Sequence, residues 1–440
     1  MHNFPKLNQI AACRTLFLHE YDGPAHKEAF REAHLRRLVR YSYDNVPYYR
    51  RLLDDTGVRP RDIQGIEDLA AVPITHKRRL QSLTADQIIA LNVEQSRLIT
   101  RRTSGSTGVP TLIRRTWFEE RLLQSFRRRA MGFLGQRSAD RVAFIGRVRS
   151  TDPNDHQFLM RIANAFGFYQ TFIIDCFLPI TEILRQMSMV KADIVTGLSG
   201  VLFQLAQTIL HKGYDRIAPR FVVTGGEMLT PYMRKQIGEA FGTKVYDVYA
   251  SHEFNLIAWE CKETGEYHTC DDSLIVEVLK DGRKAEVGEQ GELVVTSLFS
   301  YAMPFIRYRL GDLVIQGLEM CSCGSTFSTI REISGRMIDY LSLSDGRKIH
   351  PYEIIRFLVH DKEVWVRQYQ LVQHSENRVT LKLVPFGTPD PKKLNEIQVK
   401  VSAIFADQAD FDVDVVEKIE GDPRGKFMVS RSHVASFYDG

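Results

Sequence analysis

The sequence predicts an α/β protein that has a large N-terminal domain and a small α+β C-terminal domain. From about residue 140, short β-rich runs alternate with helical stretches, which is typical of mostly parallel sheets covered by helices. After residue 270 the β-rich runs follow one another without helices, which indicates an antiparallel β segment. Residues 341–440 combine strands with one helix and are predicted to form the small domain.

The N-terminal part reads as helical. Residues 30–41 carry apolar side chains at spacings of three and four, the pattern of a helix with one buried face. Two breaks contain proline, at residues 45–49 and 72–75. Proline stops a helix and holds the preceding residue extended, so both breaks are predicted to be loops.

The parallel sheet is marked by β-rich runs separated by helical stretches. In the clearest unit, Thr230 is the predicted N-cap of a helix, Pro231 its first residue and Gly242 its end. A further run follows directly, which completes a strand–helix–strand unit. The predicted strands are residues 142–146, 168–174, 193–197, 221–224 and 244–249.

The antiparallel segment is predicted from residues 273–279 and 292–297, with a turn at Asp281–Gly282. The domain boundary is placed near Gly335. This gives a large domain over residues 1–334, a hinge over residues 335–340 and a small domain over residues 341–440. In the small domain, strands are predicted at residues 364–372, 378–384 and 411–419, and a helix at residues 392–406.

Composition narrows the class of protein. Hydrophobic residues make up 44% and charged residues 25% of 440, the balance of a well-packed soluble protein. No apolar run reaches the ~18 residues of a membrane span, and the N-terminus lacks the pattern of a secretory signal. A cytoplasmic location is therefore expected. A net charge of +4 does not indicate a nucleic-acid partner.

The sharpest local motif is a loop rich in glycine and hydroxyl groups over residues 103–111, Thr-Ser-Gly-Ser-Thr-Gly-Val-Pro-Thr. Its glycines let backbone N–H groups approach anionic oxygens, and its hydroxyls supply further donors, which suits a phosphate chain. Val109 stands where the common phosphate-binding loop needs lysine. Taken alone, the motif also fits a flexible polar loop. The candidate phosphate-binding residues are Thr103, Ser104, Gly105, Ser106, Thr107 and Gly108.

Further motifs follow this loop in a fixed order. They are Gly225-Gly226-Glu227, Tyr-Ala-Ser-His-Glu at 249–253, Arg-Tyr-Arg-Leu-Gly-Asp at 307–312, Gly335-Arg336 and Pro-Arg-Gly-Lys-Phe at 423–427. In this order and spacing they resemble the adenylate-forming superfamily, and most closely its phenylacetate–coenzyme A ligase branch. The segment at 45–50, the Pro73/Lys77 segment and the short chain are similar to that branch in particular. The resemblance runs from about residue 30 to the C-terminus.

The resemblance implies a role for each motif. The loop at 103–111 would hold the β- and γ-phosphates of ATP, Glu253 would hold Mg²⁺, and Asp312 would accept both ribose hydroxyls. Lys426 would bridge the attacking carboxylate and the α-phosphate. Gly225 and Gly226 would let the backbone lie flat against the adenine. The other residues expected at the nucleotide are Glu227, Tyr249, Ala250, Ser251 and Arg336.

One departure from the family pattern lies at the hinge. The family has two consecutive acids after Gly-Arg and one spacer, whereas this chain reads Met337-Ile338-Asp339. Ile338 therefore stands at the usual hinge position, and Asp339 is the acid that remains. This departure bears on the second half-reaction, which in the family needs the small domain to swing.

Four of the six cysteines fall between residues 261 and 323. Cys261 and His268 form one short cluster, and Cys321 and Cys323 form another. Together they offer four ligands, which is what tetrahedral Zn²⁺ takes, and some members of the ligase branch look similar here. We therefore expect a structural zinc site. Two alternatives stay open, in which Cys270 replaces His268 or the thiols are free and buried.

The expected function is ATP-dependent activation of an aryl or related carboxylic acid to its acyl-adenylate, followed by transfer to a thiol, coenzyme A above all. Two alternatives remain. The acceptor could differ, as in AMP transfer to a cofactor hydroxyl or in an exopolysaccharide pathway. The chain could also be a non-catalytic nucleotide-binding protein on the same fold. The acid cannot be read from the sequence, and the oligomeric state stays open, a homodimer included.

Overall fold

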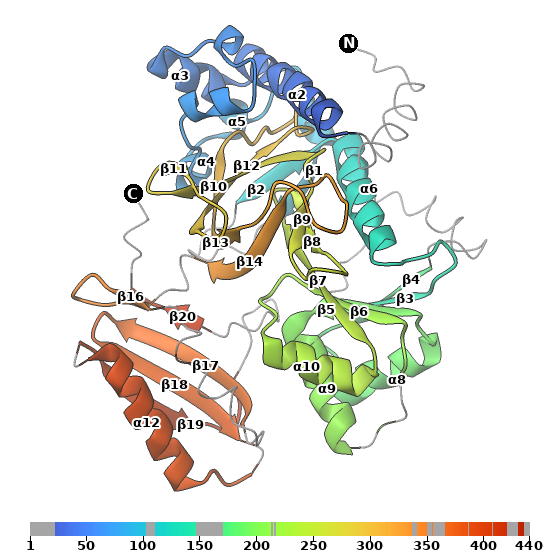
Figure 1. Ribbon diagram of the computed structural model, residues 1–440, viewed down its shortest axis with the longest axis vertical. Coiled ribbons are helices and arrows are strands. Elements are labelled where there is room, and N and C mark those ends of the chain that lie inside the picture. The colour runs from blue at the N-terminus through green and yellow to red at the C-terminus, as the bar shows by residue number, and fades with distance from the viewer. Residues whose placement is uncertain are drawn as a thin grey trace.

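The computed structural model describes residues 23–102, 111–146, 170–212, 214, 217–336, 341–349, 354, 366–385, 387–406, 408–419 and 430–434 (Figure 1). In this part of the chain the predicted fold class is confirmed. A large mixed sheet carries helices, and a smaller α+β unit follows it in the sequence.

The N-terminal helices show where one loop prediction is wrong. Only Val46, which is extended, separates α2 (Pro24–Asn45) from α3 (Pro47–Thr56). Pro47 begins a helix here because the first helical residue needs no backbone N–H donor. The prediction at 72–75 is confirmed, since this segment is extended and Thr75 bridges to Tyr308. The shorter helices are α4 (Lys77–Gln81) and α5 (Ala85–Ile88), with 3₁₀ turns at η1 (Pro60–Asp62), η2 (Glu67–Ala71) and η3 (Gln95–Arg97).

One twelve-stranded sheet joins the parallel and antiparallel halves, in the order β11-β10-β12-β13-β14-β9-β8-β7-β6-β5-β3-β4. Strands β7, β6, β5, β3 and β4 pair in parallel, and from β8 onward the pairing is antiparallel. The strands are β3 (Val142–Gly146), β4 (Thr171–Asp175), β5 (Ile194–Leu198), β6 (Phe221–Gly225), β7 (Lys244–Ser251), β8 (Asn255–Glu260), β9 (Tyr267–Thr269), β10 (Leu274–Lys280), β11 (Arg283–Lys284), β12 (Gln290–Ser297), β13 (Tyr308–Gln316) and β14 (Thr329–Arg336).

Helices cover both faces of the parallel strands. On one face, α8 (Ile180–Val190), α9 (Ser199–Lys212) and α10 (Pro231–Phe241) bury a core with alternate strand residues such as Val195 and Val222. On the other face, the end of α6 (Trp117–Phe133) packs against Ile194 and Val223. Because successive side chains of a strand point to opposite faces of the sheet, each strand contributes to both cores.

The predicted strand–helix–strand unit around α10 is confirmed. The Thr230 hydroxyl accepts a hydrogen bond from Met233 N at 3.2 Å, as an N-cap does. Pro231 is the first helical residue, and Gly242 ends the helix with φ of 64°. Only glycine adopts that left-handed conformation at little cost, which explains why the helix stops here.

A separate two-stranded hairpin carries the glycine-rich loop. Strand β1 (Ile99–Arg102) pairs antiparallel with β2 (Leu112–Arg115), and Arg102 lies opposite Leu112. Residues 103–111 therefore connect the two strands of one hairpin. Of this connection, only Thr111 lies within the described residues.

The predicted turn at Asp281–Gly282 is also confirmed. Both residues have positive φ, 50° and 81°, and the turn joins β10 to β11. Two consecutive left-handed residues give the turn whose twist matches that of paired strands.

The C-terminal unit is a four-stranded sheet in the order β19-β18-β17-β20, covered by α12 (Pro391–Phe405). Its own core gathers Leu381, Val401 and Phe405 among others. The strand predicted at 411–419 ends earlier than expected, and the domain boundaries stay a prediction. The strands are β17 (Val366–Ser375), β18 (Arg378–Pro385), β19 (Asp410–Val415) and β20 (Ser430–Ser432), and a small hairpin comprises β15 (Leu341–Ser342) and β16 (Lys348–Ile349).

Among the helices of the described ranges, none is both long and apolar enough to cross a membrane.

Candidate functional site

The two predicted carboxylates lie together, although they come from distant parts of the sequence. The Tyr249 phenol, on β7, donates a hydrogen bond to the Asp312 carboxylate, on β13, across 63 residues of chain. The Tyr308 phenol donates to Glu253 Oε1 at 3.2 Å. Segments 249–253 and 308–312 are thus joined twice, each supplying one phenol and one carboxylate. Glu253 and Asp312 are therefore linked to each other's segment through one phenol each.

The end of β14 adds the predicted Gly335-Arg336 motif to this site. In the pairing of β13 with β14, Asp312 lies opposite Arg336 and Leu313 lies opposite Gly335. The structure describes the backbone of both residues and not their side chains. The register therefore places Arg336 beside Asp312, which is where a nucleotide contact was expected.

Two glycines end β6 near this site. A side chain at Gly225 would meet Val248, whose nearest atoms lie 2.9 and 3.0 Å from the position of a Cβ. Gly226 has φ of 77°, which favours glycine. The Glu227 carboxylate accepts a hydrogen bond from Gly200 N at 2.8 Å, so it fixes this turn to the start of α9. Open α/β sheets bind their ligands at the carboxyl ends of the parallel strands.

The turn after β7 is held by its own side chains. Tyr249 and Ala250 stand at a bulge in the pairing of β7 with β8. The Ser251 hydroxyl accepts a hydrogen bond from Phe254 N at 3.2 Å, which closes the turn that carries Glu253. Bulges bend a strand and redirect its side chains, often beside active sites.

Arg115, which the sequence analysis missed, ties the glycine-rich hairpin to this turn. Its buried guanidinium donates to the carbonyl oxygens of His252 and Glu253, at 2.6 and 2.5 Å. It also pairs with Glu120, which Arg101 contacts at 2.8 Å. Although burial opposes it, these two arginines lower the pKa of Glu120 below its ordinary value. The end of β2 is thereby held at the turn that carries Glu253.

Asp247 is a second residue that the sequence analysis missed. It is buried on β7, where it accepts hydrogen bonds from Thr224 Oγ1 at 2.6 Å and Tyr267 Oη at 3.0 Å. Burial raises the pKa of Asp247 to about 7. A polar residue in an apolar strand, two positions before Tyr249, was the available signal.

The described residues leave part of the predicted site untested. Thr103, Ser104, Gly105, Ser106, Thr107, Gly108 and Lys426 lie outside them.

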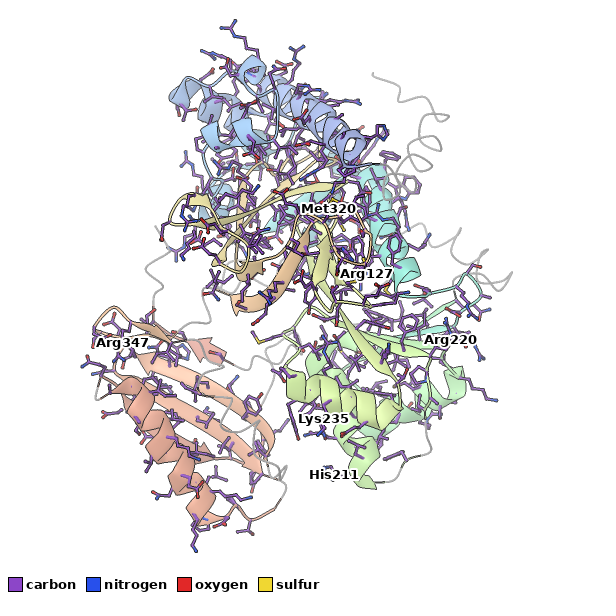
Figure 2. The ribbon with its side chains drawn as sticks, viewed as in Figure 1. Arg127, His211, Arg220, Lys235, Met320 and Arg347 are labelled. Atoms are coloured by element: carbon purple, nitrogen blue, oxygen red, sulfur yellow. The ribbon has the colours of Figure 1, made fainter. Side chains whose placement is uncertain are left out.

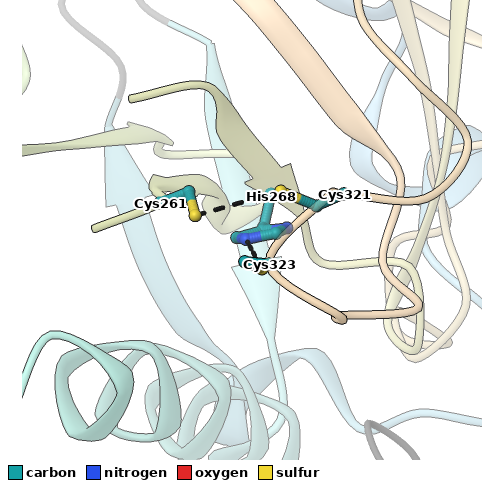
Figure 3. Close-up of side chains that lie close together, drawn as sticks. All are labelled: Cys261, His268, Cys321 and Cys323. Carbon is teal, nitrogen blue, oxygen red and sulfur yellow. Dashed lines mark hydrogen bonds between the residues drawn. The ribbon is translucent and has the colours of Figure 1, made fainter. Parts of the chain in front are cut away.

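The four predicted metal ligands do lie together (Figure 3). Cys261 follows β8, His268 lies on β9, and the loop between β13 and β14 supplies Cys321 and Cys323. The four ligand atoms lie within 4.8 Å of one another. Figure 2 labels Met320, which marks the cysteine-bearing loop. Cys270, the alternative ligand, is fully buried and is not part of the cluster.

The spacing of these atoms matches a tetrahedral metal. The Sγ atoms of Cys261 and Cys321 are 3.9 Å apart, and Cys323 Sγ lies 3.5 Å from His268 Nε2. Zinc–sulfur bonds of about 2.3 Å at tetrahedral angles place two sulfurs about 3.8 Å apart. With a zinc–nitrogen bond of about 2.0 Å, sulfur and nitrogen lie about 3.5 Å apart. The donor set therefore fits Zn²⁺.

Comparison with curated proteins gives several phenylacetate–coenzyme A ligases and a protein named CapK. The chain is 28% identical over 422 residues to a phenylacetate–coenzyme A ligase of Thermus thermophilus, covering 90% of this chain and 86% of the relative. It is 28% identical over 356 residues to a phenylacetate–coenzyme A ligase of Escherichia coli, covering 75% and 76%. Protein CapK of Staphylococcus aureus is 25% identical over 249 residues, covering 55% and 53%. No family model matches.

Solved structures of similar fold include acyl-coenzyme A ligases and an amide bond synthetase of Marinactinospora thermotolerans. A 2-hydroxyisobutyryl-CoA ligase in complex with R3-HIB-AMP superposes with a TM-score of 0.78 at 20% identity, covering 94% of this chain and 91% of that one. An anthranilate CoA ligase in complex with anthranoyl-AMP gives a TM-score of 0.54 at 14% identity, covering 77% and 67%. At these identities the likeness shows the fold. The predicted resemblance to phenylacetate–coenzyme A ligases is confirmed by the curated relatives.

Proposed function

We propose that this chain is an ATP-dependent acid–thiol ligase that converts a carboxylic acid to its acyl-adenylate and then to a thioester. The enzyme class that the sequence predicts is that of its curated phenylacetate–coenzyme A ligase relatives. One observation carries the proposal for this chain. Glu253 and Asp312 are both buried and both held by a tyrosine from the opposite segment, so two carboxylates of different expected roles share one site.

In the first half-reaction, a carboxylate oxygen of the acid attacks the α-phosphorus of ATP, and the bond to the pyrophosphate oxygen breaks. Negative charge builds up along that line, so catalysis depends on positioning and on neutralising charge. Asp312 would hold the ribose and Gly225–Gly226 would face the adenine. Lys426 and the hydroxyls of the loop at 103–111 would contact the phosphates. Arg115 would keep that loop against the turn that carries Glu253.

Glu253 fits a role as ligand to Mg²⁺. Its carboxylate is buried at the site, and the ion prefers carboxylate oxygens and bridges phosphates. The bound ion would supply positive charge against the phosphate chain. The Tyr308 phenol would hold the carboxylate in one orientation.

In the second half-reaction, a thiol sulfur attacks the carbonyl carbon of the adenylate and AMP leaves with the bonding electron pair. We propose coenzyme A as the thiol, because the curated relatives are coenzyme A ligases. An aryl or related acid is proposed on the same ground, since phenylacetate is the acid in the names of those relatives. A cytoplasmic location stays a prediction.

We also propose that Cys261, His268, Cys321 and Cys323 hold a structural Zn²⁺. The ion would join β9 and the end of β8 to the loop between β13 and β14. Four protein ligands fill a tetrahedral zinc, so this site has no open position for substrate. Its expected contribution is therefore to folding.

Pyrophosphate–ATP exchange across aryl, alkyl and amino acids tests the proposal, because it reports the first half-reaction whatever the acceptor. We expect exchange with at least one acid, and its loss in Glu253→Gln and Asp312→Asn. The control is Glu319→Gln, since the Glu319 side chain is 85% exposed. If wild type and both variants exchange equally, the roles proposed for Glu253 and Asp312 are wrong. If wild type shows no exchange with any acid while it still binds ATP, the ligase assignment is wrong.

Addition of coenzyme A to the preformed adenylate then identifies the acceptor. Release of AMP together with a thioester supports coenzyme A. Retention of the adenylate would instead favour a different acceptor on the same adenylating site.

A further inference from the structure

We propose that the Tyr249 phenol positions the Asp312 carboxylate for the ribose of ATP, and thereby sets how well the protein distinguishes ATP from deoxy-ATP. This inference rests on the proposed function and adds a positioning residue to it.

The contact between the two residues spans the sheet. Strands β7 and β13 are not neighbours, because β8, β9 and β14 lie between them in the strand order. The sheet therefore has to curve for the phenol of one strand to meet the carboxylate of the other. Such a contact does not follow from strand pairing, which makes it a feature of the site.

Both partners stand at irregularities of the sheet. In the pairing of β12 with β13, Val294 lies opposite Arg309 and Glu292 lies opposite Leu313, so Asp312 stands in a bulge. Gly311, directly before it, has φ of 84°, and no neighbouring atom would obstruct a side chain there. The glycine is therefore required for its backbone conformation and not to make space. Tyr249 is likewise beside a bulge in β7.

The chemistry of the pair suits the positioning of a carboxylate. A hydrogen bond from a phenol to a carboxylate is charge-assisted, and it is stronger where water is excluded. Asp312 is 7% exposed, so little water competes for it. Each carboxylate oxygen has two lone-pair directions, so the phenol restricts rotation without blocking a ligand. A carboxylate fixed in this way presents its remaining directions to two adjacent hydroxyls at once.

The experiment measures equilibrium binding of ATP, 2′-deoxy-ATP and 3′-deoxy-ATP to the full chain with Mg²⁺ by calorimetry, which requires no knowledge of the acid. In wild type we expect each deoxy analogue to bind about tenfold or more weakly than ATP, because one hydroxyl–carboxylate bond is lost. In Tyr249→Phe we expect ATP to bind about tenfold more weakly. The deoxy analogues should change less, so the ratio between ATP and its analogues narrows.

Tyr246→Phe is the matched control, since it removes a phenol from the same strand while its ring packs against Phe221. It should leave all three affinities and their ratios as in wild type. Asp312→Asn separates the inference from the function on which it rests. If the ratios persist in Asp312→Asn, Asp312 does not bind ribose and the proposed site is wrong.

If the ratios are lost in Asp312→Asn but unchanged in Tyr249→Phe, only the positioning role is overturned. If the ring of Tyr249 had only a structural role, Tyr249→Phe would leave the ratios unchanged, because phenylalanine keeps the ring. Thermal unfolding of Tyr249→Phe beside Tyr246→Phe checks that both variants fold. Should Tyr249→Phe fail to fold, Tyr249→Trp, which keeps an aromatic ring, takes its place beside wild type and Asp312→Asn. If the ratios of ATP affinity to deoxy-ATP affinity in Tyr249→Trp equal those of wild type, the positioning role is overturned.

Discussion

The Tyr308 phenol donates a hydrogen bond to Glu253 Oε1 at 3.2 Å, and both side chains are buried. Tyr308 begins β13, in the antiparallel half of the sheet, whereas Glu253 follows the last parallel strand. The contact therefore joins the two halves at the carboxylate that is expected to hold Mg²⁺.

Tyr308→Phe should weaken the binding of Mg²⁺ at Glu253 while the protein stays folded. The ring remains to fill the core, but the Glu253 carboxylate loses one of the donors that orient it. We expect the Mg²⁺ concentration for half-maximal pyrophosphate exchange to rise about tenfold. Tyr246→Phe provides the comparison. An unchanged Mg²⁺ dependence would contradict a role for Tyr308 at the metal.

Lys426→Ala should abolish adenylate formation and spare nucleotide binding. The ammonium is expected to act on the charge that develops as the carboxylate attacks, so its loss should lower pyrophosphate exchange by about a hundredfold or more. The affinity for ATP should stay within a few-fold. Lys400→Ala, on the exposed side of α12, is the control. Exchange within a few-fold of wild type would show that Lys426 is not the catalytic lysine.

Arg115→Met should destabilise the protein. It would remove the hydrogen bonds that Arg115 donates to the carbonyl oxygens of His252 and Glu253. It would also remove one of the two arginines that pair with Glu120. Removing one partner of a buried ion pair costs about 3–5 kcal/mol. Denaturant unfolding measures the loss, and Arg61→Met is the control because the Arg61 side chain is 84% exposed. Equal midpoints for the two variants would refute the anchoring role.

Cys321→Ser should remove the zinc. We expect wild type to contain about one zinc per chain and the variant much less, with a lower melting temperature, because structural zinc contributes directly to folding. Elemental analysis of the purified proteins gives the answer. Cys176→Ser, outside the cluster, should keep the metal. A wild-type zinc content well below one would rule the site out.

Asp247→Asn should gain stability relative to wild type as the pH rises. Burial raises the pKa of Asp247 to about 7, so between about pH 4 and 7 the folded state keeps a proton that the unfolded state has lost. Wild type therefore loses stability as the pH rises through this range, and asparagine does not. At about 1.4 kcal/mol per pKa unit, the difference is at most about 4 kcal/mol. Denaturant unfolding of both proteins at pH 5 and pH 8 measures how the difference in their free energies of unfolding changes with pH.

Asp412→Asn, on the exposed edge strand β19, is the control for that series. A difference between Asp247→Asn and wild type that stays constant with pH would show that Asp247 is ionised in the folded protein throughout.

Local chemistry explains which parts of the fold could be predicted. The helix α10 was readable because Thr230, Pro231 and Gly242 each act through their own backbone. The prediction at Pro47 was wrong because a proline can follow the end of one helix and also begin the next. The burial of Tyr48, Tyr49 and Leu53 favours a helix that begins at Pro47. The order of strands across β7, β8, β9 and β14 depends on long-range pairing, which no local pattern encodes.

The candidate site shows the same division. Glu253 and Asp312 stand in motifs whose order carries the resemblance, so they could be named. Arg115 is one of two arginines that end β2, and Asp247 is an acidic residue among apolar and aromatic ones in β7. Their partners lie up to 138 residues away in the sequence. The sequence gives no sign of which partner each will meet.

The continuity of the twelve-stranded sheet bears on when during folding the protein can first recognise ATP. Gly225 and Tyr249 precede the change from parallel to antiparallel pairing, and Asp312 follows it. A partly folded chain with only one half of the sheet would hold only some of the proposed nucleotide contacts. ATP should then bind only the chain whose long-range pairing is complete, and so act as a ligand that selects finished molecules from incomplete ones.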